Sequence, residues 1–146
     1  MIKIGARLVA EIKSHAEREY PRECCGLLVG RIEDEGRTRV VAGVHAVENT
    51  WGEGGERNRR MLIAPQEYMR AERRFAAEGL GVVGNYHSHP EHAAVPSQFD
   101  LENLAPWPTM SYVVVSVVGG RAVDLRSWEL QADRSRFIEE EISEGS

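Results

Sequence analysis

The feature that most constrains this 146-residue chain is an apolar run at residues 80–84 that leads directly into a histidine-rich segment. The run has the composition of a buried β-strand. His87 and His89 follow it. Because side chains alternate between the two faces of a strand, both imidazoles are expected on the same face. We therefore expect a fold built around a central strand that carries two histidines at its end.

Ser97 and Asp100 follow after a loop punctuated by proline. Their spacing is that of a helix N-cap and the third residue of the helix, which places both on one side. Two imidazoles and one carboxylate, with a fourth position for water, make an open catalytic zinc site. Each half of the pattern also has an ordinary interpretation, as histidines of a core or surface and as a plain helix cap. The combination at this spacing favours a metal site made by His87, His89 and Asp100.

The string His87-x-His89-Pro90-x6-Ser97-x-x-Asp100 resembles the signature of the JAMM/MPN+ zinc metallopeptidases. The pattern is specific because it is long, mixed in residue type and fixed in spacing. The expected helices and strands also follow one another in the family's order, so the resemblance covers nearly the whole chain. It implies an α/β fold in which a curved mixed β-sheet is flanked by helices, similar to the architecture of cytidine deaminases.

The family also has a glutamate well upstream, and the segment at residues 21–30 is similar to its surroundings in short stand-alone prokaryotic members. The resemblance implies one Zn²⁺ per chain, held by the three ligands named above, which lowers the pKa of a bound water from about 16 towards about 7. It further implies that Glu23 is the general base and that Ser97 stabilises the oxyanion. Losing such an oxyanion donor typically costs about 10²–10³ in rate.

Composition bounds the other possibilities. At this length the chain is expected to form one domain, residues 1–146, with a sizeable core. With 28% charged and 42% hydrophobic residues it reads as an ordinary soluble protein, and the sequence shows neither a secretory leader nor an apolar run long enough to span a membrane. We therefore expect a cytoplasmic protein. The net charge of −5 argues against nucleic acid as a partner.

Hydrophobic periodicity and turn residues predict the remaining elements. The predicted helices are at residues 6–20, 64–79 and 97–103, and the predicted strands are at residues 25–31, 38–47, 80–84, 112–118 and 121–130. The tail at residues 137–142 is ambiguous by pattern, and the resemblance to the family implies that it is a last strand. Strands mixed with flanking helices would also suit a deaminase. We reject that alternative because the Pro-Cys-x-x-Cys segment that holds zinc in deaminases is absent from the sequence.

Some residues near these elements have two interpretations. Cys24 and Cys25 are expected to be reduced thiols on a half-buried strand, since adjacent cysteines rarely bridge to each other. If that strand begins by Glu23, the Cys25 thiol shares its face and lies near the metal. The basic cluster at residues 57–60 is either a solvated rim or a contact for substrate. His15 is expected to be a solvated histidine on the polar or boundary side of the first helix.

The resemblance also sets the expected function. Members of the family cleave peptide or isopeptide bonds after the C-terminal Gly-Gly of ubiquitin or similar β-grasp proteins, and short bacterial members look like processors of sulfur-carrier proteins. We therefore expect a zinc peptidase that releases cysteine or a short peptide from such a tail. Two alternatives stay open: a general deconjugase that removes ubiquitin-like modifiers from lysine, and a non-catalytic MPN module that binds protein. The sequence does not identify the carrier protein.

Overall fold

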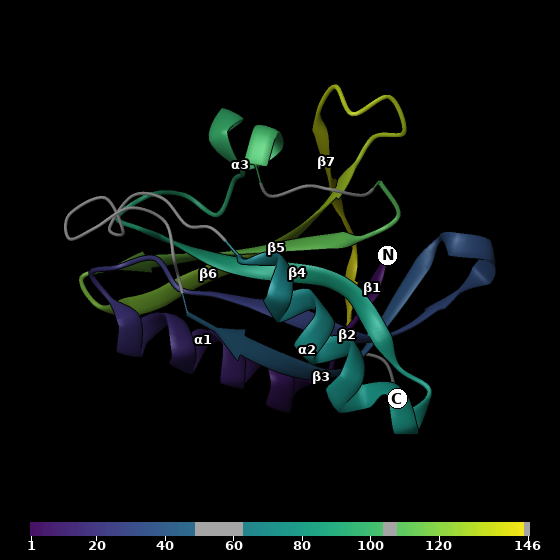
Figure 1. Cartoon of the computed structure of the whole chain (residues 1–146). Helices are drawn as coiled ribbons and strands as arrows, with labels where there is room; N and C mark the ends of the chain where they lie inside the picture. Colours follow the sequence, from purple (N-terminus) through teal and green to yellow (C-terminus); the bar gives the residue numbers. More distant parts are fainter. Residues whose placement is uncertain (49–62, 104–107, 145–146) are drawn as a thin grey trace.

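The computed structural model describes residues 1–48, 63–103 and 108–144 (Figure 1). Strands dominate this part of the chain. They form a sheet with helices on both sides. The elements in chain order are β1 Ile2–Lys3, α1 Ala6–Glu19, β2 Cys25–Glu33, the 3₁₀ turn η1 Asp34–Gly36, β3 Thr38–Val47, α2 Pro65–Phe75, the 3₁₀ turn η3 Ala76–Glu78, β4 Gly81–Pro90, α3 Gln98–Asn103, β5 Ser111–Val118, β6 Arg121–Leu130, β7 Phe137–Glu140 and β8 Ile142–Ser143.

All of these strands belong to one eight-stranded sheet with the order β7-β6-β5-β4-β2-β3-β1-β8. The sheet is mixed: β4 runs parallel to β5, whereas β2 is antiparallel to both β3 and β4. Strands β7 and β8 lie at opposite edges, although only residue 141 separates them in the chain. The sheet must therefore curl until its edges approach each other, which agrees with the expected curved mixed sheet. The tail was predicted as a single strand at residues 137–142, and this was wrong because the chain changes edges at residue 141.

One face of the sheet is covered by α1. Leu8, Ile12 and Ala16, each four residues apart, are its buried residues. They pack in a cluster that includes Tyr86 and Val115 from the central strands. The helix thus buries a single stripe, as its amphipathic pattern predicted.

The other face of the sheet is covered by α2 and α3. Ala71 of α2 packs in a cluster with Leu27 and Val29 of β2, and Leu101 of α3 packs near Tyr112 of β5. Figure 1 shows α1 and α3 on opposite sides of the sheet. Because β4 lies between β2 and β5, its alternate side chains face one layer of helices or the other.

Gly26 lets the two central strands carry a large buried ring. A Cβ atom on Gly26 would lie 2.2 Å from carbons of the Tyr86 side chain, so only glycine fits there. The Tyr86 hydroxyl is 2.8 Å from His15 Nδ1. Burial lowers the pKa of His15, against the attraction of Glu19. His15 thus lies at the boundary of the helix's buried face, but it is not fully solvated as expected, because the imidazole is half-buried and contacts the Tyr86 hydroxyl.

A buried arginine joins strands that are not neighbours in the sheet. The side chain of Arg39 on β3 is 1% exposed, and its Nη2 atom lies 2.6 Å from carboxylate oxygens of both Glu129 and Glu140. Its Nε atom donates to Ser111 Oγ at 2.9 Å. Strand order separates β3 from β5, β6 and β7, so these contacts exist only because the sheet curls.

We expect Arg39→Lys to lower the free energy of unfolding by about 1.5–3 kcal/mol, because one ammonium group cannot replace the three guanidinium nitrogens. These nitrogens donate to Ser111, to the Gly36 carbonyl and to the two glutamates. Urea unfolding followed by circular dichroism measures this change. Arg31→Lys is the matched control, since Arg31 is exposed and its ion pair with Glu33 spans 3.5 Å. Its effect should stay within about 0.5 kcal/mol. Equal stability of the two variants would contradict the prediction.

The strands predicted at residues 25–31 and 38–47 are present and pair as antiparallel neighbours, and so are those predicted at residues 112–118 and 121–130. Strand β1 was not predicted. Among the described helices, none combines the length and apolar character that crossing a membrane would require.

Candidate metal centre

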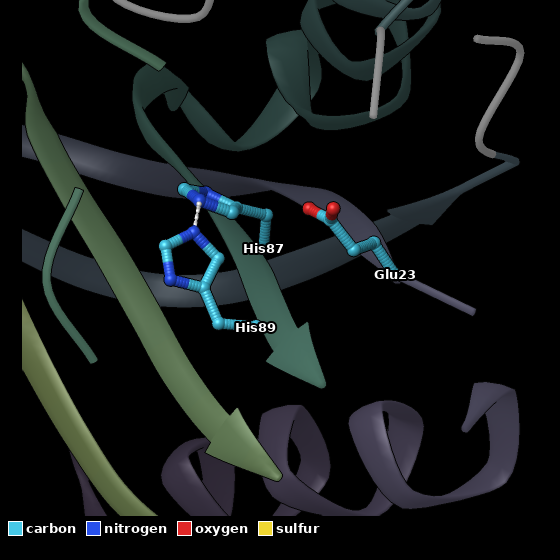
Figure 2. A group of neighbouring side chains, drawn as sticks. All are labelled: Glu23, His87 and His89. Atoms are coloured by element: carbon cyan, nitrogen blue, oxygen red, sulfur yellow. Dashed lines mark hydrogen bonds between the residues drawn. The ribbon is translucent and has the colours of Figure 1, made fainter. Parts of the chain in front are cut away.

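Three elements bring the predicted site residues together. Strand β4 carries His87 and His89 on one face, Asp100 is the third residue of α3, and Glu23 lies just before β2. Figure 2 shows the two imidazoles side by side, with the carboxylate of Glu23 turned toward them. His87 and Asp100 are buried, and Glu23 is 3% exposed. Residues far apart in the sequence thus meet where β4 passes β2.

Three ligand atoms form a nearly equilateral triangle. His87 Nε2 and His89 Nε2 are 3.0 Å apart, and each lies 3.1 Å from Asp100 Oδ2. Ligand atoms held at about 2.0–2.1 Å by a tetrahedral Zn²⁺ are themselves about 3.3 Å apart. The triangle therefore has nearly the size that one ion requires.

The tautomer of His89 makes this triangle a strong site for a cation. His89 Nδ1 lies 3.0 Å from the carbonyl oxygen of Ala93. A carbonyl can only accept, so Nδ1 carries the hydrogen and a neutral His89 has a lone pair on Nε2. That lone pair faces a carboxylate oxygen of Asp100, which also can only accept. Two facing acceptors repel each other, and a cation between them relieves the repulsion.

The electrostatics of the other two ligands point the same way. Burial lowers the pKa of His87, against the attraction of the Asp100 carboxylate. Burial alone would raise the pKa of Asp100, but the two histidines hold it well below its ordinary value. A neutral imidazole and an ionised carboxylate are the forms that bind metal. Within the described residues, His87 Nδ1 is buried without a hydrogen-bond partner, so His87 makes its polar contacts through Nε2. The donor set therefore fits a divalent ion.

Local structure explains how Asp100 reaches the histidines. The Ser97 N–H donates to Asp100 Oδ2 at 2.8 Å, and the Asp100 N–H donates to Ser97 Oγ at 3.1 Å. This is the reciprocal capping arrangement that the spacing predicted, and α3 begins at the next residue, Gln98. The cap fixes the carboxylate toward β4 and leaves Ser97 exposed at the rim.

A second carboxylate, that of Glu23, approaches the imidazoles from the segment that precedes β2, the strand next to β4. Ligand atoms of Glu23, His87 and His89 all lie within 4.8 Å of one another, so this group is itself able to hold a metal ion. Glu23 also lines a cleft of about 650 Å³ together with His89 and Ser97. The cleft wall includes Pro90, Ala93 and Val95, which are apolar and mostly small. The geometry thus offers two carboxylates, and Asp100 makes the closer contact with the histidines.

Sequence reasoning missed the residues that hold the cleft wall. Three successive carbonyls of the motif loop each accept a hydrogen bond from a strand side chain. Ser116 Oγ donates to His92 O at 2.6 Å, His89 Nδ1 to Ala93 O at 3.0 Å and Trp128 Nε1 to Ala94 O at 3.1 Å. The loop between β4 and α3 is therefore fixed by β4, β5 and β6. No local sequence signal links Ser116 or Trp128 to this loop, because both contacts depend on sheet pairing.

The two cysteines have different surroundings. Cys24 packs on the α1 side of the sheet and Cys25 on the α2 side. Both are free and buried, and burial raises the pKa of the Cys24 thiol to about 12 and that of Cys25 higher still. The Cys25 thiol contacts the Val47 carbonyl at 3.9 Å, and the metal-capable group named above contains no cysteine. The cysteines are free, as expected, but the prediction of a half-buried strand was wrong at this point, because both thiols are fully buried. The basic cluster at residues 57–60 lies outside the described residues.

Comparison with known proteins identifies a family for most of the chain. Residues 5–131 match the family described as prokaryotic homologs of the JAB domain. The chain is 34% identical to the "Probable TtuB-protein conjugate cleaving protease" of Thermus thermophilus, over 79% of this chain and 70% of that protein. It is 32% identical to a desampylase of Haloferax volcanii, over 81% and 82% of the two chains. Identity with the CysO-cysteine peptidase of Mycobacterium tuberculosis is 29%, over 89% and 83%.

Solved structures agree in fold. A solution structure of a protein from Desulfitobacterium hafniense superposes with a TM-score of 0.80 at 31% identity, covering 97% of this chain and 91% of that one. A JAB1/MPN domain protein from Archaeoglobus fulgidus gives a TM-score of 0.57 at 18% identity, covering 97% and 96%. The second likeness, at such low identity, extends to the fold alone.

Proposed function

This chain belongs to the family of prokaryotic homologs of the JAB domain, and we propose that it is a zinc-dependent peptidase that cleaves the amide bond after the C-terminal Gly-Gly tail of a ubiquitin-like or sulfur-carrier protein. We assign one Zn²⁺ to His87, His89 and Asp100. We also propose that residues 1–146 form a single domain.

One observation carries the proposal. The three ligand atoms of the triangle are 3.0–3.1 Å from one another, and a second carboxylate, Glu23, stands beside them in the same cleft. A purely structural zinc site has four protein ligands and is closed. A site with three close ligands and a separate carboxylate at its open side is instead suited to hydrolysis.

The proposed mechanism divides the work among the residues of the cleft. A bound Zn²⁺ would supply a Lewis acid that polarises the scissile carbonyl and makes a water nucleophilic near neutral pH. Glu23 accepts the proton of the attacking water and then delivers it to the nitrogen of the leaving amine. Ser97 donates a hydrogen bond to the oxygen that becomes negative. The cap between Ser97 and Asp100 holds donor and ligand in a fixed relation.

The shape of the cleft supports a glycine-rich tail as substrate. Pro90, Ala93 and Val95 form an apolar part of its wall beside Glu23, His89, His92 and Ser97. The loop that carries them is fixed by three side-chain hydrogen bonds. A wall fixed in this way, with small apolar residues along it, suits an extended backbone that lacks bulky side chains. The names of the three relatives refer to TtuB-protein conjugates, to desampylation and to a CysO-cysteine substrate, and we propose this chemistry for the present chain.

A second candidate is removal of a ubiquitin-like modifier from a lysine side chain. The similarity to desampylases favours it. The bond cleaved would again follow the Gly-Gly tail, so the two candidates share the site and differ only in the leaving amine.

The test offers the zinc-loaded protein ubiquitin-like and sulfur-carrier proteins that end in a C-terminal cysteine, a short peptide or a lysine-linked protein. Intact-mass spectrometry follows release, with chelator-treated protein as the control. Release of cysteine or a short peptide supports carrier maturation, and release of a lysine-linked protein supports the second candidate. If none of these conjugates is cleaved, the proposed function is wrong.

A further inference from the structure

Ser88, the residue between the two histidines, contacts the segment that carries Glu23. Its side chain is fully buried on the face of β4 opposite the metal-capable group, toward α1. Two hydrogen bonds join it to Cys24. The Ser88 N–H donates to Cys24 O at 3.1 Å, and the Cys24 N–H donates to Ser88 Oγ at 2.8 Å. Ser88 therefore meets both backbone polar groups of the residue next to Glu23.

The second of these bonds is unusual for a sheet. In a regular antiparallel ladder, residues of a hydrogen-bonded pair exchange two backbone N–H···O=C bonds. The ladder between β2 and β4 ends at the pair Cys25 and His87. One residue further on, Ser88 Oγ takes the place of the carbonyl that a continuing ladder would use. The pairing is thereby extended to Cys24 by a side chain.

The contact fixes where Glu23 can lie. Cys24 is 2% exposed, and a buried N–H without an acceptor is strongly unfavourable. The hydrogen bond to Ser88 thus holds the backbone of Cys24 beside the part of β4 that carries the two histidines. Glu23, one residue earlier, then has its carboxylate beside both imidazoles (Figure 2). Side chains of successive residues face opposite sides of a strand. The hydroxyl of Ser88, on the α1 side of the sheet, therefore affects the position of the Glu23 carboxylate in the cleft on the other side.

We propose that Ser88 is a positioning residue that sets the distance between the Glu23 carboxylate and the two histidines. The proposal rests on the proposed function, since it assigns Ser88 its effect through the general base. Ser88 touches neither substrate nor metal. Without its hydroxyl, the Cys24 N–H would turn to another acceptor, and Glu23 would move with it.

The test compares Ser88→Ala with Ser88→Thr, which restores the hydroxyl. We expect the alanine variant to lower kcat about 10- to 100-fold, since small misplacements of a catalytic group have effects of this size. KM and zinc affinity should be unchanged, because the substrate wall and the metal ligands are untouched. The threonine variant should recover most of the loss. Ser127→Ala is the matched control, since it also removes a buried hydroxyl. Ser127 lies on β6, and its hydroxyl donates to Glu140 at 2.7 Å.

A second readout does not depend on activity. Amide hydrogen exchange measured by NMR should show faster exchange of the Cys24 N–H in Ser88→Ala and protection regained in Ser88→Thr. Unchanged Cys24 exchange, or a folded alanine variant with normal kcat, would overturn the proposal. A raised KM with normal kcat would do the same. If the wild-type protein cleaves no conjugate, the proposed function fails, and the exchange of the Glu23 and Cys24 amides alone decides whether Ser88 fixes this segment.

Discussion

Replacing Glu23 with glutamine is expected to lower kcat by about 10²–10⁴-fold while the protein still binds one metal ion. Glutamine has the shape of glutamate but cannot accept a proton. The substitution therefore removes the proposed proton transfer and leaves the packing of the buried side chain in place. Turnover of the cleavable conjugate, measured beside metal content by mass spectrometry, gives both quantities on the same sample.

Glu78→Gln is the matched control, because Glu78 is exposed in the 3₁₀ turn η3, which precedes the start of β4, whereas the histidines lie near the end of that strand. It should leave kcat and metal content unchanged. Two results would contradict the assignment of Glu23 as general base. Normal turnover in Glu23→Gln would show that another group moves the proton. Loss of metal would make Glu23 a ligand, which its position within 4.8 Å of the histidine ligand atoms also allows.

The metal-capable site was predictable because two local rules determine it. Alternation along a strand puts His87 and His89 on one face, and the capping pattern puts Asp100 beside Ser97. The only further requirement for this site is that β4 and α3 pack close together. The approach of Glu23 was not a local property, and its prediction came from resemblance to the family.

The rest of the fold depends on contacts between distant residues, which periodicity does not reveal. The pairing of Arg39 with Glu140 spans 101 positions and requires the sheet to curl. The bonds from Ser116 and Trp128 to the motif loop depend on the register of β5 and β6. The tail divides into β7 and β8 because β7 pairs with β6 at one edge of the sheet and β8 pairs with β1 at the other. The apolar pattern of the tail does not show this division.

Asp100 is expected to be the residue whose loss has the largest effect on the metal centre. Its Oδ2 atom is 3.1 Å from both imidazole nitrogens, and its low pKa keeps it charged. Losing an outer-shell partner typically costs 10–100-fold in metal affinity, so removing Asp100, the ligand proposed here, in Asp100→Ala should cost more than about 100-fold. Turnover should be lost with the metal. Competition with a chromophoric chelator measures the affinity.

Alanine also removes the acceptor for the Ser97 N–H, so a second variant must separate the cap from the charge. Asp100→Asn keeps an amide oxygen for that N–H but loses the anion that pairs with the cation, and we expect it to bind metal weakly with α3 intact. Glu102→Ala, an exposed change in the same helix, should bind metal like the wild type. If Asp100→Ala keeps wild-type affinity while Glu23→Gln loses it, the two carboxylates exchange roles, with Glu23 the ligand. If Asp100→Ala instead loses the metal while Glu23→Gln keeps it, Asp100 is the ligand. Glu23 is then not needed for metal binding and is left as the residue that transfers the proton.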